Sequence, residues 1–94
     1  MKEKDGLLIE LTHLLNSQKL AVLSTHNAGQ PYASLVSFAP NAELTQLLFA
    51  TTRSTRKYAN LTSDERAAML IDNRSNEETD IHSAMAVTAT GFVK

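Results

Sequence analysis

The apolar residues near the start of the chain recur at helical spacing, with polar residues between them. This pattern predicts an amphipathic helix over residues 5–17, in which Asp5 caps the first turn. We expect its apolar stripe to pack on a sheet, and a surface for a partner helix is the alternative. The residues of the stripe are Leu7, Leu8, Leu11, Leu14 and Leu15.

Further along, apolar residues come in short runs or alternate with small polar residues, which is typical of β-strands. Turn residues separate the first three runs, with Asn27 and Gly29 in one turn and Pro40 in the next. These three strands are therefore expected to form an antiparallel meander. Gly91 interrupts the last run, which indicates a bulge or a close approach of backbone or ligand. The expected strands are residues 19–25, 32–38, 44–51, 67–71 and 85–93.

Short antiparallel strands with flanking helices predict a mainly β fold. We expect about five strands and two helices in a small barrel or curled sheet. The second helix is short and follows the third strand, whereas the polar residues 72–82 are expected to form an exposed loop. The strand over residues 85–93 leaves an edge, which either a second subunit or sequence missing from this chain is expected to cover.

The connection between the third and fourth strands concentrates hydroxyl and basic residues. Ser54 is a good N-cap for the short helix, which places basic residues in the first helical turn. Cations are unfavourable beside the positive end of a helix dipole, and no Asp or Glu lies between Glu43 and Asp64 to neutralise them. The residues concerned are Thr51, Thr52, Arg53, Ser54, Thr55, Arg56 and Lys57.

Hydroxyl groups, free first-turn N–H groups and guanidinium forks together match the oxygens of a phosphate. The sequence therefore predicts a phosphate site at this turn. A solvated basic turn whose charges pair with distant carboxylates is the alternative.

Composition narrows the classes of function. The 94 residues fit a single domain over residues 1–94, and a formal net charge of -1 argues against a broad nucleic-acid surface. The absence of cysteine excludes a disulfide framework and a thiolate metal site. No apolar run approaches the roughly 20 residues of a membrane span, and the charged start is not a signal peptide, so a cytoplasmic location is expected.

Other candidates for chemistry lack a recognisable pattern. His13, His26 and His82 are too dispersed for a metal motif, and the acidic residues between positions 72 and 80 lack the spacing of cation ligands. The serines have no His and Asp partners in an evident arrangement, so nucleophilic catalysis is not expected. No metal site is predicted.

Six segments that follow the first predicted helix along the chain resemble the pyridoxamine 5′-phosphate oxidase-like, FMN-binding split-barrel family. The resemblance spans nearly the whole chain, and its most specific part combines a strand, a Thr-rich turn, an Arg-Lys pair and an Asn-Leu pair. The six segments are residues 20–25 (LAVLST), 29–36 (GQPYASLV), 49–52 (FATT), 54–61 (STRKYANL), 68–74 (AMLIDNR) and 86–91 (AVTATG).

This resemblance implies an antiparallel split β-barrel and a homodimer with two FMN sites at the subunit interface. The family's strand that passes the flavin ring corresponds to Ser34, Leu35, Val36 and Ser37. The end of the next strand corresponds to Ala50 and Thr51. The flavin phosphate would meet Thr52, Thr55, Arg56 and Lys57. The partner's flavin would sit near Asn73 and Arg74, which follow the fourth strand.

The chain departs from the true oxidases of this family in two respects. Those enzymes carry an Arg in the stretch that matches residues 32–34 and a basic residue near Ser37, and both are missing here. Their substrate-phosphate ligands lie in a C-terminal segment, with a terminal strand and helix that this chain does not contain. Oxidation of pyridoxamine phosphate is therefore not expected.

Two classes of function remain. The first is an FMN-dependent oxidoreductase with an unidentified small-molecule substrate, in which no catalytic side chain is assigned. The alternative is a noncatalytic module that binds a phosphoryl ligand, either flavin or haem. Haem-handling relatives of the fold make His82 a candidate axial ligand, although no neighbouring residue supports that role. Nucleic-acid binding through the basic turn is disfavoured by the net charge.

Overall fold

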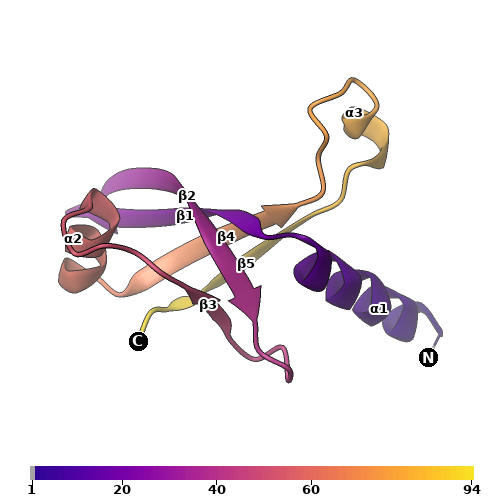
Figure 1. The fold of residues 1–94 in the computed structure, drawn as a ribbon, viewed down its shortest axis with the longest axis horizontal. Coiled ribbons are helices and arrows are strands. Elements are labelled where there is room, and N and C mark those ends of the chain that lie inside the picture. The colour runs from indigo at the N-terminus through magenta and orange to yellow at the C-terminus, as the bar shows by residue number, and fades with distance from the viewer. Residues whose placement is uncertain (1) are drawn as a thin grey trace.

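A computed structural model describes residues 2–94 of the chain, with side chains from Gly6 onward. Figure 1 shows a curled sheet with α1 and α2 at opposite ends and α3 on a loop that stands away from it. In chain order the elements are α1 (Lys2–Ser17), β1 (Leu20–Asn27), β2 (Gln30–Pro40), β3 (Leu47–Phe49), α2 (Arg56–Ser63), β4 (Arg66–Asp72), α3 (Asp80–Ser83) and β5 (Ala86–Phe92).

The sheet is antiparallel throughout, in the order β3-β2-β1-β4-β5. A two-residue turn joins β1 to β2, and both of its residues, Ala28 and Gly29, have positive φ. Such turns match the right-handed twist of the strands that they connect. The predicted meander and the mainly β, half-barrel fold class are therefore confirmed, although Ala28 takes the strained position that Asn27 was expected to take.

The core lies on one face of the sheet because side chains alternate between the two faces of each strand. In β1, Ala21 and Leu23 point into the core, and in β4, Met69 and Ile71 do the same. α1 covers this face with its last two turns. The buried apolar residues are Leu14, Leu15, Ala21, Leu23, Val36, Phe38, Met69 and Ile71.

The apolar stripe of α1 packs only in part. The helix begins at Lys2, before the expected start, and the side chain of Asp5 lies outside the described side chains, which begin at Gly6. Leu14 and Leu15 are buried, but Leu7 is 66% exposed and Leu8 is 55% exposed. The expectation that the whole stripe packs is wrong, because the N-terminal half of α1 extends beyond the sheet (Figure 1).

β3 is shorter than the strand expected over residues 44–51. The side-chain oxygen of Asn41 accepts hydrogen bonds from the backbone N–H of Thr45 at 2.9 Å and of Gln46 at 3.0 Å. Leu44 adopts a φ of 57° within the same loop. These features fold the chain into a turn. The β2–β3 ladder therefore includes only three residue pairs, and the first of them joins Phe38 to Phe49.

The polar segment expected to be a loop contains a third helix, α3, so the expected number of helices is wrong. Asp80 begins α3 and accepts hydrogen bonds from the backbone N–H groups of Ser75 at 2.7 Å, Asn76 at 2.6 Å and Glu77 at 3.2 Å. Partial desolvation raises the pKa of Asp80, but these hydrogen bonds and one from the Ser75 hydroxyl outweigh it and lower the pKa overall.

β5 pairs with β4 without interruption from Ala86 to Phe92. Gly91 lies opposite Ala67 in this regular register, so the expected bulge is absent from the pairing of the described strands. A Cβ atom at Gly91 would meet no described atom within 4 Å. The sequence signal at this glycine therefore does not reflect crowding within the described chain.

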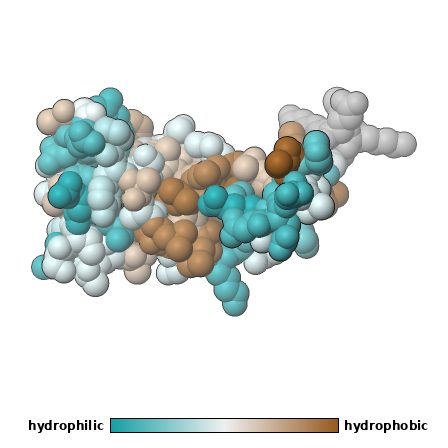
Figure 2. All heavy atoms as spheres, turned by 90° about the horizontal axis from the view of Figure 1, so that it is seen from above, coloured by the Kyte–Doolittle hydropathy of each residue, from teal (hydrophilic) through white to brown (hydrophobic). Residues whose placement is uncertain are grey.

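The outer face of the sheet is open. Leu20 is 54% exposed and Leu35 is 63% exposed on this face. Figure 2 shows apolar atoms gathered across the middle of the side seen from above. Within residues 2–94, no helix has the length and hydropathy needed to cross a membrane.

Candidate functional site

The predicted phosphate turn is built by threonine hydroxyl groups just beyond β3. The Thr55 hydroxyl donates to the carbonyl oxygen of Thr52 at 2.8 Å, and Thr51 Oγ1 lies 2.9 Å from Thr55 Oγ1. The backbone N–H of Thr55 also donates to the Thr52 carbonyl, at 3.3 Å. These bonds close a compact turn that delivers the chain into α2.

Thr55, and not Ser54, is the N-cap of α2. Its φ and ψ of -89° and 155° are extended, and its hydroxyl oxygen accepts a hydrogen bond from the backbone N–H of Tyr58 at 3.3 Å. The prediction for Ser54 is wrong by one position, because Thr51 and Thr52 hold the Thr55 hydroxyl in place. α2 therefore begins at Arg56, which places Arg56 and Lys57 in its first turn as predicted.

The cations at this turn have no described acidic partner. No acidic residue lies in the first turn of α2. Among the side chains of residues 6–94, every ion pair involves His26, Arg66 or Arg74, and none involves Arg53, Arg56 or Lys57. The positive end of the helix dipole and two basic side chains therefore act on the same small region.

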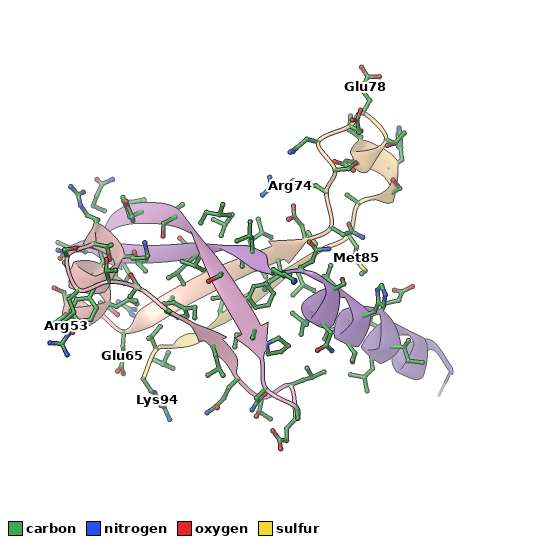
Figure 3. All side chains as sticks on the ribbon, in the orientation of Figure 1. Arg53, Glu65, Arg74, Glu78, Met85 and Lys94 are labelled. Carbon is green, nitrogen blue, oxygen red and sulfur yellow. The ribbon has the colours of Figure 1, made fainter. Side chains whose placement is uncertain are left out.

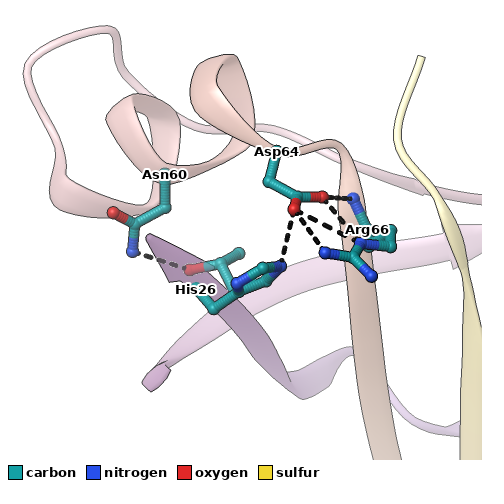
Figure 4. Close-up of polar contacts among 5 residues, drawn as sticks. His26, Asn60, Asp64 and Arg66 are labelled. Carbon is teal, nitrogen blue, oxygen red and sulfur yellow. Dashed lines mark hydrogen bonds and ion pairs between the residues drawn. The ribbon is translucent and has the colours of Figure 1, made fainter. Parts of the chain in front are cut away.

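The nearest carboxylate along the chain is already paired, as Figure 4 shows. Asp64 accepts hydrogen bonds from Arg66 Nη2 at 2.7 Å and Arg66 Nε at 3.0 Å, and it lies 3.0 Å from His26 Nε2. The side-chain and backbone hydrogen bonds from Arg66 hold the pKa of Asp64 well below its usual range, and the same contact raises the pKa of Arg66. Asp64 is therefore not a counter-ion for the basic turn.

Tyr32 connects the basic turn to the start of β2. The guanidinium carbon of Arg56 lies 5.6 Å from the centroid of the Tyr32 ring, within the range of a cation–π contact. Sequence analysis did not assign Arg56 this contact, because the two residues lie on different elements. The contact ties Arg56 to β2 two residues before Ser34, the first of the residues expected to pass a flavin ring.

The four predicted β2 residues divide between the two faces of the sheet. Val36 is buried in the core, so only its backbone is available to a ligand. Leu35 and Ser37 are exposed, and the half-buried Ser34 has a buried hydroxyl oxygen with no hydrogen-bond partner among the described residues. The described ladder with β3 reaches only to Phe38, so the edge of β2 before Phe38 has no described strand partner. Ala50 and Thr51 directly follow β3, after its last residue pair with β2.

Asn73 and Arg74 lie away from the basic turn. Asn73 extends the β4–β5 pairing, because its side-chain oxygen accepts a hydrogen bond from the backbone N–H of Met85 at 2.6 Å. Arg74 Nε lies 2.7 Å from a carboxylate oxygen of Asp72. Figure 3 shows Arg53 and Arg74 at opposite ends of the sheet. Within one chain, the structure does not bring the twelve predicted residues into a single site.

A shallow groove of about 200 Å³ lies on the outer face beside Arg74. One wall is apolar, with Leu20, Val22 and Leu35, and the other carries the Asp72–Arg74 pair. This groove therefore joins two predicted site residues, Leu35 and Arg74, at a distance along the sheet from the phosphate turn.

Sequence reasoning also missed a buried polar contact behind the turn. Asn60 Nδ2 donates a hydrogen bond to Thr25 Oγ1 at 3.1 Å, and both residues are 2% exposed. The available signal was an Asn within a short helix, a position that is unfavourable for its backbone preferences. Among the described residues, no group of three or more His, Asp or Glu side chains is arranged to hold a metal ion.

Comparison with solved structures supports the fold. One solved chain superposes with a TM-score of 0.80 at 20% identity, covering 94% of this chain and 59% of its own length. The haem storage protein HutZ from Vibrio cholerae has a TM-score of 0.75 at 19% identity, covering 89% of this chain and 58% of HutZ. An FAD-binding protein from Mesorhizobium loti has a TM-score of 0.60 at 20% identity, covering 74% of this chain and 50% of its own length.

This chain thus spans between 50% and 59% of the length of those structures. No curated protein matches the sequence at a significant level. A family model described as pyridoxamine 5′-phosphate oxidase matches residues 7–94, which include both the basic turn and the strand before Arg74. The chain belongs to the pyridoxamine 5′-phosphate oxidase family.

Proposed function

We propose that this protein binds FMN and serves as an oxidoreductase for a small-molecule substrate. The observation that carries the proposal is the first turn of α2, where two cations and free backbone N–H groups face no described acidic residue. A phosphate dianion would neutralise this region, with charge-assisted hydrogen bonds from Arg56 and Lys57 and hydroxyl contacts from Thr52 and Thr55.

The edge of β2 is the proposed place for the flavin ring. Backbone groups of Ser34, Leu35, Val36 and Ser37 lie along a strand edge that β3 leaves uncovered, and Ala50 and Thr51 directly follow β3. A strand edge offers alternating donors and acceptors, which suit the pyrimidine edge of a flavin. The unpartnered Ser34 hydroxyl adds one more polar group on the same strand.

The distribution of the predicted residues supports a site shared by two copies of the chain. Arg74 and the groove on the outer face lie far from the phosphate turn of their own chain (Figure 3). In a twofold homodimer, Asn73 and Arg74 of one copy would approach the flavin of the other. The exposed Leu20 and Leu35 on the open face would lose contact with water in such an arrangement.

When bound, FMN supplies hydride or electron transfer at its ring, while the protein supplies binding, orientation and electrostatics. Arg56 and Lys57 would fix the phosphate end, and the β2 edge would fix the ring end. Residues 32–34 and 37 carry no basic side chain, so the substrate is proposed to be something other than pyridoxamine phosphate. The alternative is a noncatalytic flavin-binding or haem-binding module, which the similarity to a haem storage protein supports.

The test is a titration of the purified protein with FMN and with riboflavin, which lacks the phosphate. We expect Arg56→Ala plus Lys57→Ala to weaken FMN binding by about 100-fold or more, since each charge-assisted bond contributes about 1.5–3 kcal/mol. Riboflavin binding should change little in the same variant. Arg53→Ala is the matched control, because Arg53 is exposed and precedes the α2 cap.

Equal affinity for FMN and riboflavin in the unmodified protein would contradict the phosphate assignment. Haem absorbance bands after haem addition, without any flavin binding, would support the alternative module. Turnover of reduced FMN with a small-molecule acceptor separates an oxidoreductase from a flavin carrier.

A further inference from the structure

Two polar residues are buried in the described structure, and their side chains contact each other. Thr25 lies in the central strand β1, and Asn60 lies in the middle of α2, 35 residues further along the chain. Asn60 Nδ2 donates to Thr25 Oγ1 at 3.1 Å (Figure 4). A buried polar pair of this kind fixes one relative position of two elements, because any other position leaves its groups without partners.

α2 depends on contacts of this kind to hold its orientation. It has eight residues, which is too short for a helix to be stable alone in water. Its apolar anchoring is slight, since Leu61 is only partly buried against the core and Tyr58 is 39% exposed. The basic residues in its first turn also oppose the helix dipole. The Asn60–Thr25 hydrogen bond is therefore a principal constraint on how α2 sits on the sheet.

The same hydrogen bond belongs to a chain of contacts that leads from α2 through the sheet and back to Arg56. Asn60 lies four positions after Arg56, so the two side chains project from the same face of α2. The Arg56 guanidinium lies over the ring of Tyr32, and Tyr32 is the direct strand partner of Thr25 in the β1–β2 ladder. A rotation or shift of α2 that broke the Asn60–Thr25 bond would also move Arg56 off Tyr32.

We propose that Asn60 and Thr25 are positioning residues for Arg56: their hydrogen bond sets the rotation of α2 that places the guanidinium over Tyr32, ready for a phosphate. This inference rests on the proposed function for the identity of the ligand. The geometry itself concerns only residues of this chain, so the positioning of Arg56 can be tested without any ligand.

The first test uses NMR of the ligand-free protein. The chain has only two tyrosines, Tyr32 and Tyr58, so their ring signals are readily assigned. Arg56→Ala should shift the Tyr32 ring signals, and Thr25→Val should shift them in the same direction. Thr25→Ser keeps the hydroxyl and should leave them near their original positions. Unchanged Tyr32 signals in Thr25→Val would overturn the proposal.

A double variant controls for the loss of stability that Thr25→Val alone is expected to cause. Thr25→Val leaves the Asn60 amide buried without its partner, whereas Thr25→Val with Asn60→Leu replaces both groups by apolar ones, which is nearly neutral for stability in favourable cases. The double variant should fold, as measured by its thermal melting, and should still show the shifted Tyr32 signals. A folded double variant with unshifted signals would also overturn the proposal.

The second test is a double-mutant cycle on FMN affinity. Arg56→Ala should weaken FMN binding by about tenfold or more in the unmodified protein, but by less than about threefold in the Thr25→Val background, because Arg56 is already displaced there. Equal factors in both backgrounds would mean that Thr25 acts only on stability, which overturns the positioning role. If the unmodified protein binds no FMN, the proposed function fails, and the Tyr32 signals alone decide the positioning role.

Discussion

Two connections in this protein each place a short helix between antiparallel strands, and they differ in how their backbone donors are satisfied. In the connection from β4 to β5, the Asp80 carboxylate accepts hydrogen bonds from three successive backbone N–H groups, beginning at Ser75. In the connection from β3 to β4, the first turn of α2 has no acidic residue and begins with Arg56 and Lys57.

This difference supports the proposal that the connection from β3 to β4 binds an external anion. Successive N–H groups form a natural anion site, and in the first connection the chain supplies the anion itself. In the second connection, Asp64, the carboxylate nearest to the basic turn along the chain, is occupied by Arg66 and His26 at the far end of α2. The cations of the basic turn therefore have no acidic partner among the side chains of residues 6–94, which is the basis for proposing a ligand there.

The largest effect is expected when the basic turn is given an anion of its own, which removes the difference between the two connections. Thr55→Asp would place a carboxylate at the N-cap of α2, beside Arg56 and Lys57. Asp and Asn are equally good N-caps, so Thr55→Asn is the matched neutral control. We expect FMN affinity in Thr55→Asp to be lower than in Thr55→Asn by about 100-fold or more, because the carboxylate repels and replaces the phosphate.

Thermal melting completes this test. Thr55→Asp should melt at or above the temperature of Thr55→Asn, since an acid at a helix N-terminus is stabilising by about 0.3–1 kcal/mol. Similar FMN affinities in the two variants would show that the phosphate does not lie at this turn.

Removal of the internal anion is the converse experiment, with a smaller effect. Asp80→Ala should leave the N–H groups of Ser75, Asn76 and Glu77 exposed to water, and their hydrogen exchange should accelerate by about tenfold. Asp80→Asn keeps one side-chain oxygen as an acceptor and should give an intermediate rate. Exchange in β1 should not change, because the loop stands away from the sheet (Figure 1). Equal exchange rates in all three proteins would show that Asp80 does not organise the loop.

The strands were predictable from sequence where burial follows alternation. β1 was predicted from its apolar run over residues 20–23, and in the structure every second residue from Ala21 to Thr25 is buried. β3 was predicted too long, because the Asn41 side chain folds residues 41–46 into a loop that the apolar pattern does not reveal. Leu7 and Leu8 fit the helical stripe, but the sheet does not reach them.

The candidate site was predictable where its signal was local. The Arg56-Lys57 pair and the absence of nearby acids could be read directly along the chain. The cap was misplaced by one residue, because Ser54 and Thr55 are both good caps and the choice depends on hydrogen bonds to Thr51 and Thr52. The contacts of Arg56 with Tyr32 and of Asn60 with Thr25 join distant segments, and no local pattern predicts them.

The smallest expected effect is on the stability of the fold at low pH. It concerns the two carboxyl groups that accept hydrogen bonds within the chain. The side-chain and backbone hydrogen bonds from Arg66 lower the pKa of Asp64, and hydrogen bonds from the Ser75–Glu77 segment lower that of Asp80 despite its partial desolvation. A carboxyl whose pKa is lower in the folded state stabilises the fold above its unfolded pKa and loses this contribution as the pH falls through the folded value.

We therefore expect the melting temperature to be nearly constant above about pH 5 and to decline below about pH 4, the usual range of an Asp pKa. A variant with Asp64→Asn and Asp80→Asn should melt lower at neutral pH but lose less between pH 5 and pH 3, because it lacks both of these carboxyls. Thermal melts of the two proteins across this range measure the difference. If the melting temperatures of both proteins declined in parallel, the acid sensitivity would come from other carboxyl groups. The hydrogen bonds of Asp64 and of Asp80 would then make no measurable contribution to it.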